Sequence, residues 1–187
     1  MNIVYFDIET KKSFQEVGGK LNIQNLGMSI GVTFSTARNS YKIYQEKNVN
    51  DLISELQRAD LVVGFNHTQF DFQVLMAYTI FDFSHVPSLD LMLDIQAKIG
   101  RKISLDSLAE ATLGLKKTSE GLQAIKWFKE GKLLEIAEYC CYDVKLTKLL
   151  HEFGAKHGKV FYVNNLNELT TVEVNWKPNA FSPSNTK

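Results

Sequence analysis

The chain has 187 residues, of which 44% are hydrophobic and 22% are charged, and this composition is that of one folded globular domain. No apolar run approaches the roughly 18 residues that a membrane span needs, and no signal-type segment opens the chain, so we expect a soluble cytoplasmic protein with no membrane partner. The 21 basic and 21 acidic residues cancel, which excludes the overall positive field of many nucleic-acid-binding proteins, although metal ions in an acidic pocket can still attract phosphate.

The first part of the chain predicts an antiparallel meander followed by an alternation of strands and helices. Residues 2–6 form a short apolar run that ends in Asp7, as expected for a buried strand that reaches the edge of a sheet. In chain order we then predict strands over 28–34 and 40–45 with a turn at 37–39, a helix over 49–59 and a buried strand over 61–65.

The second part is mainly helical and closes with a hairpin. The patterns predict a helix over 70–80, a mixed helical segment over 89–100, a helix over 104–113 with Ser104 as its N-cap and Gly114 past its end, a long helix over 133–157 stopped by Gly158, and a hairpin of strands 159–163 and 170–175. The elements together predict one α/β domain over residues 1–176, with a mixed central β-sheet flanked by α-helices, and a flexible tail over 177–187.

Two carboxylates stand at the end of the first predicted strand. Strand alternation sends the side chains of Asp7 and Glu9 to the same face. Two carboxylates at such a short distance repel each other and raise each other's pKa unless a cation compensates their charge. The pair is therefore typical of a metal-binding site. A solvated strand end would explain the same residues equally well.

A third carboxylate, Asp71, follows the predicted strand 61–65 through the segment Asn66 to Phe70 and lies in the first turn of the next helix. Taken alone, it is better explained as a residue that favours the positive end of the helix dipole, with Asn66 shaping the turn. The position is nevertheless the mouth of the sheet, where α/β folds place their ligands.

The long helix carries the last pair of candidate residues. Tyr139 and Asp143 are four residues apart and project from one face of this helix. A buried tyrosine bonded to a helix-face aspartate is an equally good explanation of the pair alone. The only cysteines, Cys140 and Cys141, lie between them and are interpreted as small buried hydrophobic residues.

Together, Asp7-x-Glu9, Asn66-x-x-x-Phe70-Asp71 and Tyr139-x-x-x-Asp143 resemble, in order and spacing, the motifs of the ribonuclease H-like 3′-5′ exonucleases with four acids and a tyrosine, the DEDDy group. The resemblance covers residues 1 to about 150. The subgroup that uses histidine as its base would need it at position 138, where this chain has Glu138. Among DEDDy proteins the chain is similar to the stand-alone bacterial proteins of the YprB type.

The resemblance implies that Asp7, Glu9, Asp71 and Asp143 bind two divalent cations, Mg²⁺ or Mn²⁺, over a phosphodiester bond at the 3′ end of single-stranded DNA or RNA. Glu9 would help to orient the attacking water. Tyr139 would position this water by hydrogen bonding and is not assigned as the base, because the pKa of an ordinary tyrosine is near 10.

Contacts to the nucleic acid are predicted for Thr10, Asn66 and Phe70, the last by stacking on a base. His67 is a further candidate, although a single histidine on a loop has no specific signature.

Two other functions fit the same fold. A nucleic-acid-binding or scaffold module would have lost turnover, but the four acids would then repel one another without a compensating cation. An endonuclease would differ from an exonuclease by cutting circular substrate. The motifs indicate neither DNA nor RNA.

Overall fold

The computed structural model describes residues 1–115 and 121–177. In chain order its strands are β1 (Ile3–Thr10), β2 (Met28–Ser35), β3 (Ser40–Gln45), β4 (Leu61–Gly64), β5 (Ser88–Asp90), β6 (Lys159–Val163) and β7 (Leu169–Glu173). The α-helices are α1 (Val49–Gln57), α2 (Asp71–Leu75), α3 (Leu91–Ile99), α4 (Leu105–Leu113), α5 (Gly121–Lys129) and α6 (Leu133–His157), and short 3-10 helices are η1 (Lys20–Leu26), η2 (Glu46–Asn48) and η3 (Phe83–His85).

The central sheet has five strands in the order β3-β2-β1-β4-β5. Strands β1, β2 and β3 pair antiparallel, while β1 pairs parallel with β4, and β4 pairs parallel with β5. The prediction of an antiparallel meander that continues into a mixed sheet is therefore confirmed.

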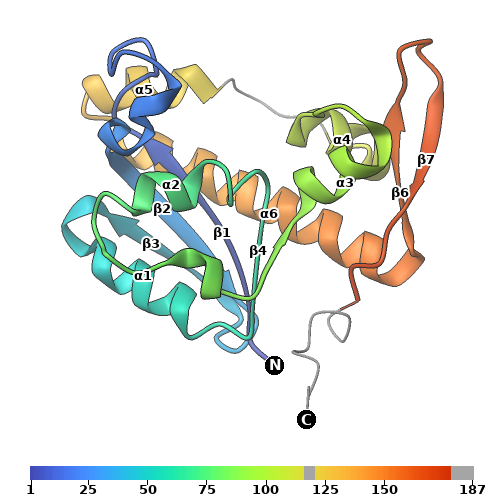
Figure 1. The fold of residues 1–187 in the computed structure, drawn as a ribbon, viewed down its shortest axis with the longest axis horizontal. Coiled ribbons are helices and arrows are strands. Elements are labelled where there is room, and N and C mark those ends of the chain that lie inside the picture. The colour runs from blue at the N-terminus through green and yellow to red at the C-terminus, as the bar shows by residue number, and fades with distance from the viewer. Residues whose placement is uncertain (116–120, 178–187) are drawn as a thin grey trace.

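Helices cover both faces of the sheet, and β1 contributes to both cores because its side chains alternate (Figure 1). Val4 and Phe6 pack on the face that α1 and α2 cover. Ile3 and Tyr5 point to the opposite face, which α6 crosses. The odd-numbered side chains of β1 therefore face α6, and this register decides where the carboxylates that follow Tyr5 will point.

Several elements differ from the sequence prediction, and three of these differences are large. The helix predicted over 70–80 is wrong in length, since α2 ends at Leu75 and the chain then turns so that Tyr78 Oη accepts a hydrogen bond from Met28 N–H at 2.8 Å. The segment over 89–100 begins with the strand β5, because these residues pair with the end of β4. Helix α5 was not predicted at all.

The chain ends in a two-stranded sheet, β6 and β7, as predicted, and this sheet packs beside α4 and α6 (Figure 1). After β7 the side chain of Trp176 is buried against Gly154 of α6, where a Cβ atom would lie 2.2 Å from the indole ring. Of the tail predicted over 177–187, all but Lys177 lies outside the described residues. Within the described ranges, no helix has the length and apolar character to cross a membrane.

Candidate metal centre

Three of the four predicted acids converge between β1 and α6. Asp7 and Glu9 continue the face of β1 that α6 crosses, and Asp143 projects from α6 toward them. Each offers a carboxylate oxygen, and these oxygens lie within 4.8 Å of one another. Strand alternation correctly placed Asp7 and Glu9 on one face of β1. This face lies opposite the Asp143 side chain of α6.

The electrostatics of this group are unfavourable without a cation. Burial raises the pKa of Asp7 well above its usual range, and the neighbouring carboxylates of Asp71, Glu9 and Asp143 raise it further. Divalent cations such as Mg²⁺ prefer oxygen ligands, which carboxylates provide. A bound cation would also offset the repulsion between these neighbouring carboxylates. The residues present thus fit Mg²⁺ or Mn²⁺.

Asp71 lies beside this group and outside the three-carboxylate cluster. It is the first residue of α2, it is 3% exposed, and its Oδ1 accepts a hydrogen bond from the Ile8 N–H of β1 at 3.0 Å. Burial raises the pKa of Asp71 to about 7, against the opposing effect of the Ile8 hydrogen bond. This hydrogen bond fixes the carboxylate of the second motif to the strand that carries the first.

Tyr139 is buried on the same side of α6 as Asp143. Burial raises the pKa of its phenol far above 10, and the charges of Asp143, Glu9 and Asp7 raise it further. The Tyr139 ring contacts that of Trp127 on α5 edge to face, with 6.2 Å between centroids. Trp127 therefore supports the tyrosine through α5.

A cavity of about 460 Å³ opens beside the carboxylates. The three predicted nucleic-acid contacts, Thr10, Asn66 and Phe70, all line it together with Asp7, Glu9 and Asp71. Sequence reasoning missed the other lining residues, which come from β1 and the segment after it, from η1, from the residue after β4 and from α5: Ile8, Lys12, Ser13, Phe14, Leu26, Phe65, Leu122 and Ile125. Only the apolar spacing within 121–129 could have indicated that this segment is a helix.

His67 does not reach this cavity. Its side chain is fully buried and packs edge to face against Phe6 and Phe72, with centroid separations of 5.5 and 4.9 Å. Burial lowers the pKa of His67 to about 4, so the ring is neutral at physiological pH. Its role is therefore to pack beneath the loop, and the candidate ligand contact at this position is wrong.

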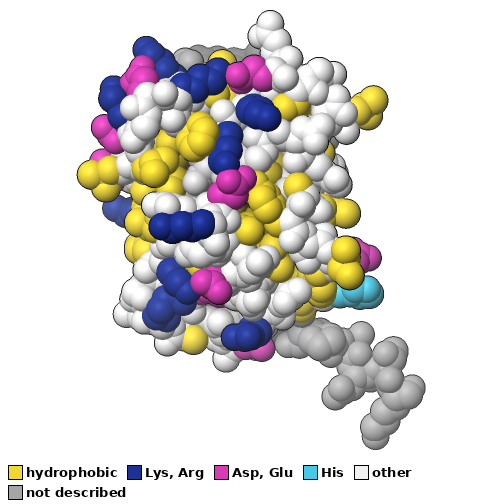
Figure 2. All heavy atoms as spheres, turned by 90° about the vertical axis from the view of Figure 1, so that its left-hand side faces the viewer, with side chains coloured by type: hydrophobic (Ala, Val, Ile, Leu, Met, Phe, Trp, Pro, Cys, Tyr) yellow, Lys and Arg dark blue, Asp and Glu magenta, His cyan; other side chains and the backbone are white. Residues whose placement is uncertain are grey.

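Basic side chains near the cavity are dispersed. Figure 2 shows the side of the molecule with α5 and η1, where hydrophobic side chains gather in the middle and Lys and Arg alternate with Asp and Glu. Lys129 of α5 pairs with Glu16 at 2.6 Å, and Lys11 pairs with Glu46. Among the described residues that line the cavity, Lys12 is the basic one.

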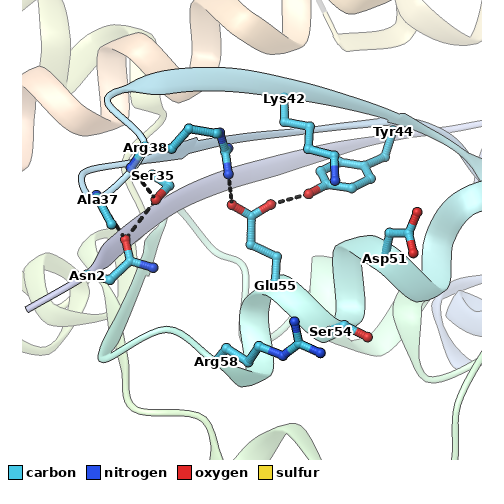
Figure 3. Close-up of a pocket in the computed structure, with 10 residues that line it drawn as sticks. All are labelled: Asn2, Ser35, Ala37, Arg38, Lys42, Tyr44, Asp51, Ser54, Glu55 and Arg58. Atoms are coloured by element: carbon cyan, nitrogen blue, oxygen red, sulfur yellow. Dashed lines mark hydrogen bonds and ion pairs between the residues drawn. The ribbon is translucent and has the colours of Figure 1, made fainter.

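A larger cavity, of about 680 Å³, lies at the other end of β1, beside Asn2, and between β3 and α1 (Figure 3). Its central carboxylate, Glu55, accepts hydrogen bonds from Arg38 at 2.7 Å, from Thr33 at 3.0 Å and from Tyr44. These polar groups satisfy one another and hold α1 to the sheet. The polar groups at the centre of this cavity therefore have a structural explanation, whereas the converging carboxylates lie at the smaller cavity.

Comparisons with known proteins agree with this geometry. Residues 4–153 match a family described as the RNase_H superfamily (RNase_H_2). No curated protein matches the chain in sequence. Among solved structures, the fold is similar to that of the family B DNA polymerase from the hyperthermophilic archaeon Pyrobaculum calidifontis, with a TM-score of 0.62 at 16% identity. The match covers 82% of this chain and 24% of the polymerase chain. Because the family match spans most of the sequence, the chain belongs to the RNase H superfamily.

Proposed function

We propose that this protein is a two-metal-ion 3′-5′ exonuclease of the DEDDy group that hydrolyses phosphodiester bonds of single-stranded nucleic acid. The RNase H superfamily consists in general of hydrolytic nucleases, which gives the proposal its reaction class. The observation that carries it is the convergence of Asp7, Glu9 and Asp143 within 4.8 Å, with Tyr139 on the same side of α6.

Asp7, Glu9, Asp71 and Asp143 would hold two divalent cations, Mg²⁺ or Mn²⁺. When bound, such cations supply activation of a water molecule and neutralise the charge that builds on the phosphate. The protein must hold the remaining groups in place. Glu9 would orient the water by accepting a hydrogen bond from it.

Tyr139 would act as a hydrogen-bond donor throughout the reaction. Its raised pKa keeps the proton on Oη at neutral pH, so the phenol can hold the water or a phosphate oxygen but cannot remove a proton. The contact with Trp127 restricts the ring and helps to keep the hydroxyl near the acids.

The terminal nucleotide of the nucleic acid would enter the cavity beside the acids. Phe70 and Phe14 meet edge to face there, with 6.0 Å between centroids, and provide aromatic surface for a base. Thr10 and Asn66 would provide polar contacts to sugar or phosphate.

The test is degradation of 5′-labelled single-stranded DNA and RNA in Mg²⁺ or Mn²⁺, with circular single-stranded DNA in parallel. Wild-type protein should shorten linear substrate from the 3′ end and leave the circle intact. Asp7→Ala and Asp143→Ala should abolish the ladder, while Asp51→Ala, an exposed acid on α1, should leave it unchanged.

Other outcomes would assign another function. Cleavage of the circle would make the protein an endonuclease. Metal-independent cleavage, or cleavage that survives both substitutions, would reject the proposed centre. Binding of single strands without any cleavage would favour the non-catalytic binding module.

A further inference from the structure

The carboxylate of Asp90 accepts four hydrogen bonds, three of them from the loop that leads to Asp71. Asp90 ends β5 and is 8% exposed. Its Oδ1 accepts from Asn66 N–H at 2.8 Å and from Leu93 N–H, at the start of α3, at 3.2 Å. Its Oδ2 accepts from the N–H and the hydroxyl of Thr68, at 3.1 and 2.9 Å. One side chain thus joins the sheet, a helix start and the loop.

This loop adopts a conformation that needs such support. Asn66 has a φ of 65°, in the left-handed region that non-glycine residues rarely adopt. The loop then closes on itself, because Phe70 N–H donates to the Asn66 carbonyl at 3.0 Å and Phe72 N–H donates to the His67 carbonyl at 2.9 Å. The N–H groups of Asn66 and Thr68 are left for Asp90.

The loop is also fixed from below by packing. The ring of His67 lies against Gly64, where a Cβ atom would come within 2.7 Å of His67 Nδ1, so no other residue fits at Gly64 without movement. His67 Nδ1 is 3.6 Å from Asp90 Oδ2. The packing of His67 on Gly64 therefore fixes the distance of the loop from the sheet. The carboxylate of Asp90 fixes the orientation of the loop backbone.

We propose that Asp90 is a positioning residue for the metal centre. It does not line the cavity, and it acts by holding the Asn66–Phe70 loop so that Asp71 at its end meets Ile8 N–H and faces Asp7. Outer groups that orient metal ligands have large effects on metal affinity when they are changed. The inference rests on the proposed function, since it assumes that Asp71 faces bound cations.

The test measures Mn²⁺ binding by titration calorimetry, with no nucleic acid present. Asp90→Asn keeps the shape of the side chain but replaces one acceptor oxygen by an NH₂ group, so the loop donors on that side lose their acceptor. We expect Mn²⁺ affinity to fall about 10- to 100-fold. Thr68→Val removes only the hydroxyl donor and should weaken binding in the same direction by less than about tenfold.

The matched control is Ser104→Ala, which removes an N-cap from α4, where Ser104 Oγ accepts from Ser107 N–H at 3.1 Å. It should lower the melting temperature and leave Mn²⁺ affinity unchanged. Asp90→Asn and Thr68→Val variants that unfold earlier but bind Mn²⁺ like the wild type would overturn the positioning role.

The same titration separates the two proposals. Wild-type protein that binds Mn²⁺ and cleaves nothing would reject the nuclease and leave the role of Asp90 supported by an affinity loss in both Asp90→Asn and the charge-neutral Thr68→Val. Wild-type protein that binds no Mn²⁺ would overturn both. Active protein whose Asp90 variants bind Mn²⁺ normally would overturn only the role of Asp90.

Discussion

Cys140 Sγ lies 3.2 Å from Asp7 Oδ2 and 3.3 Å from the Asp7 carbonyl oxygen, so a fully buried thiol donates to the carboxylate of β1. The sequence predicted Cys140 and Cys141 to be small buried residues, which is confirmed for Cys140, whereas Cys141 is only half-buried. The hydrogen bond adds a function, because it stabilises the ionised form of Asp7 against the burial and neighbouring charges that raise its pKa.

The first prediction follows from this contact. Cys140→Ala removes the donor, and the Mg²⁺ concentration for half-maximal nuclease activity should rise by about tenfold. Cys140→Ser keeps a donor at nearly the same place and should stay close to the wild type. Cys141→Ala is the matched control, as its half-buried neighbour on α6. An unchanged Mg²⁺ requirement in Cys140→Ala would show that the thiol only fills space.

The second prediction concerns the cost of keeping Asp71 buried. Its pKa is raised to about 7 by burial, whereas in the unfolded chain it ionises near pH 4. A group with a raised folded pKa contributes its full stability below the unfolded pKa and loses it as pH rises to the folded value. The metal-free protein should therefore lose stability between about pH 4 and pH 7.

Asp71→Asn tests this directly, since the amide oxygen can still accept from Ile8 N–H. In EDTA at pH 8 the variant should be more stable than the wild type by on the order of 2–4 kcal/mol, and the difference should vanish near pH 4. Mg²⁺ should stabilise only the wild type strongly. Chemical denaturation with and without Mg²⁺ measures both effects, and Asp51→Asn, at an exposed position of α1, should change neither. A gain that is independent of pH would contradict the assignment.

The sequence predicted the elements whose patterns are long and local. Helix α6 begins and ends where its apolar spacing and Gly158 indicate, because a 25-residue amphipathic pattern leaves little choice. The strand β5 has only three residues, and its pairing with β4 is what makes it a strand. Such short elements depend on partners that a local pattern does not contain.

The same distinction applies to the candidate site. The acids could be found from three motifs, because each motif is local and their order is specific. The contact of Cys140 with Asp7 joins residues 133 positions apart, and Asp90 holds Asn66 across 24 positions. These supporting residues carry no motif of their own, so only the folded structure could identify them.

The third prediction separates positioning from acid-base roles at Tyr139. Tyr139→Phe removes the hydroxyl and keeps the ring that packs on Trp127, so kcat should fall about 10- to 100-fold with little change in Mn²⁺ affinity. Because burial raises the pKa of the phenol above its ordinary value, the wild-type rate should show no titration attributable to this tyrosine near neutral pH. Tyr162→Phe on β6 is the control. Loss of a basic limb from the pH profile in Tyr139→Phe would instead assign proton transfer to the phenol.

The fourth prediction concerns the end of the domain predicted over residues 1–176. Trp176 is 1% exposed, its Nε1 donates to Asp94 Oδ2 at 2.8 Å, and its carbonyl accepts from His151 Nε2 at 2.9 Å. Because His151 Nε2 carries the proton in this neutral ring, His151 Nδ1 accepts a hydrogen bond from the Tyr5 hydroxyl at 2.8 Å. His151 thereby connects Trp176 to β1. Trp176→Ala should therefore cost about 3–5 kcal/mol of unfolding free energy.

Loss of this packing should leave the acids in place, because Trp176 follows β7 and packs against Gly154 near the end of α6, about three helical turns beyond Asp143. Nuclease activity per folded molecule should stay close to wild type below the lowered melting temperature. Leu166→Ala, which removes a 77% exposed side chain from the hairpin loop, should change neither stability nor activity. A Trp176→Ala variant as stable as the wild type in urea denaturation would place the end of the folded domain before residue 176.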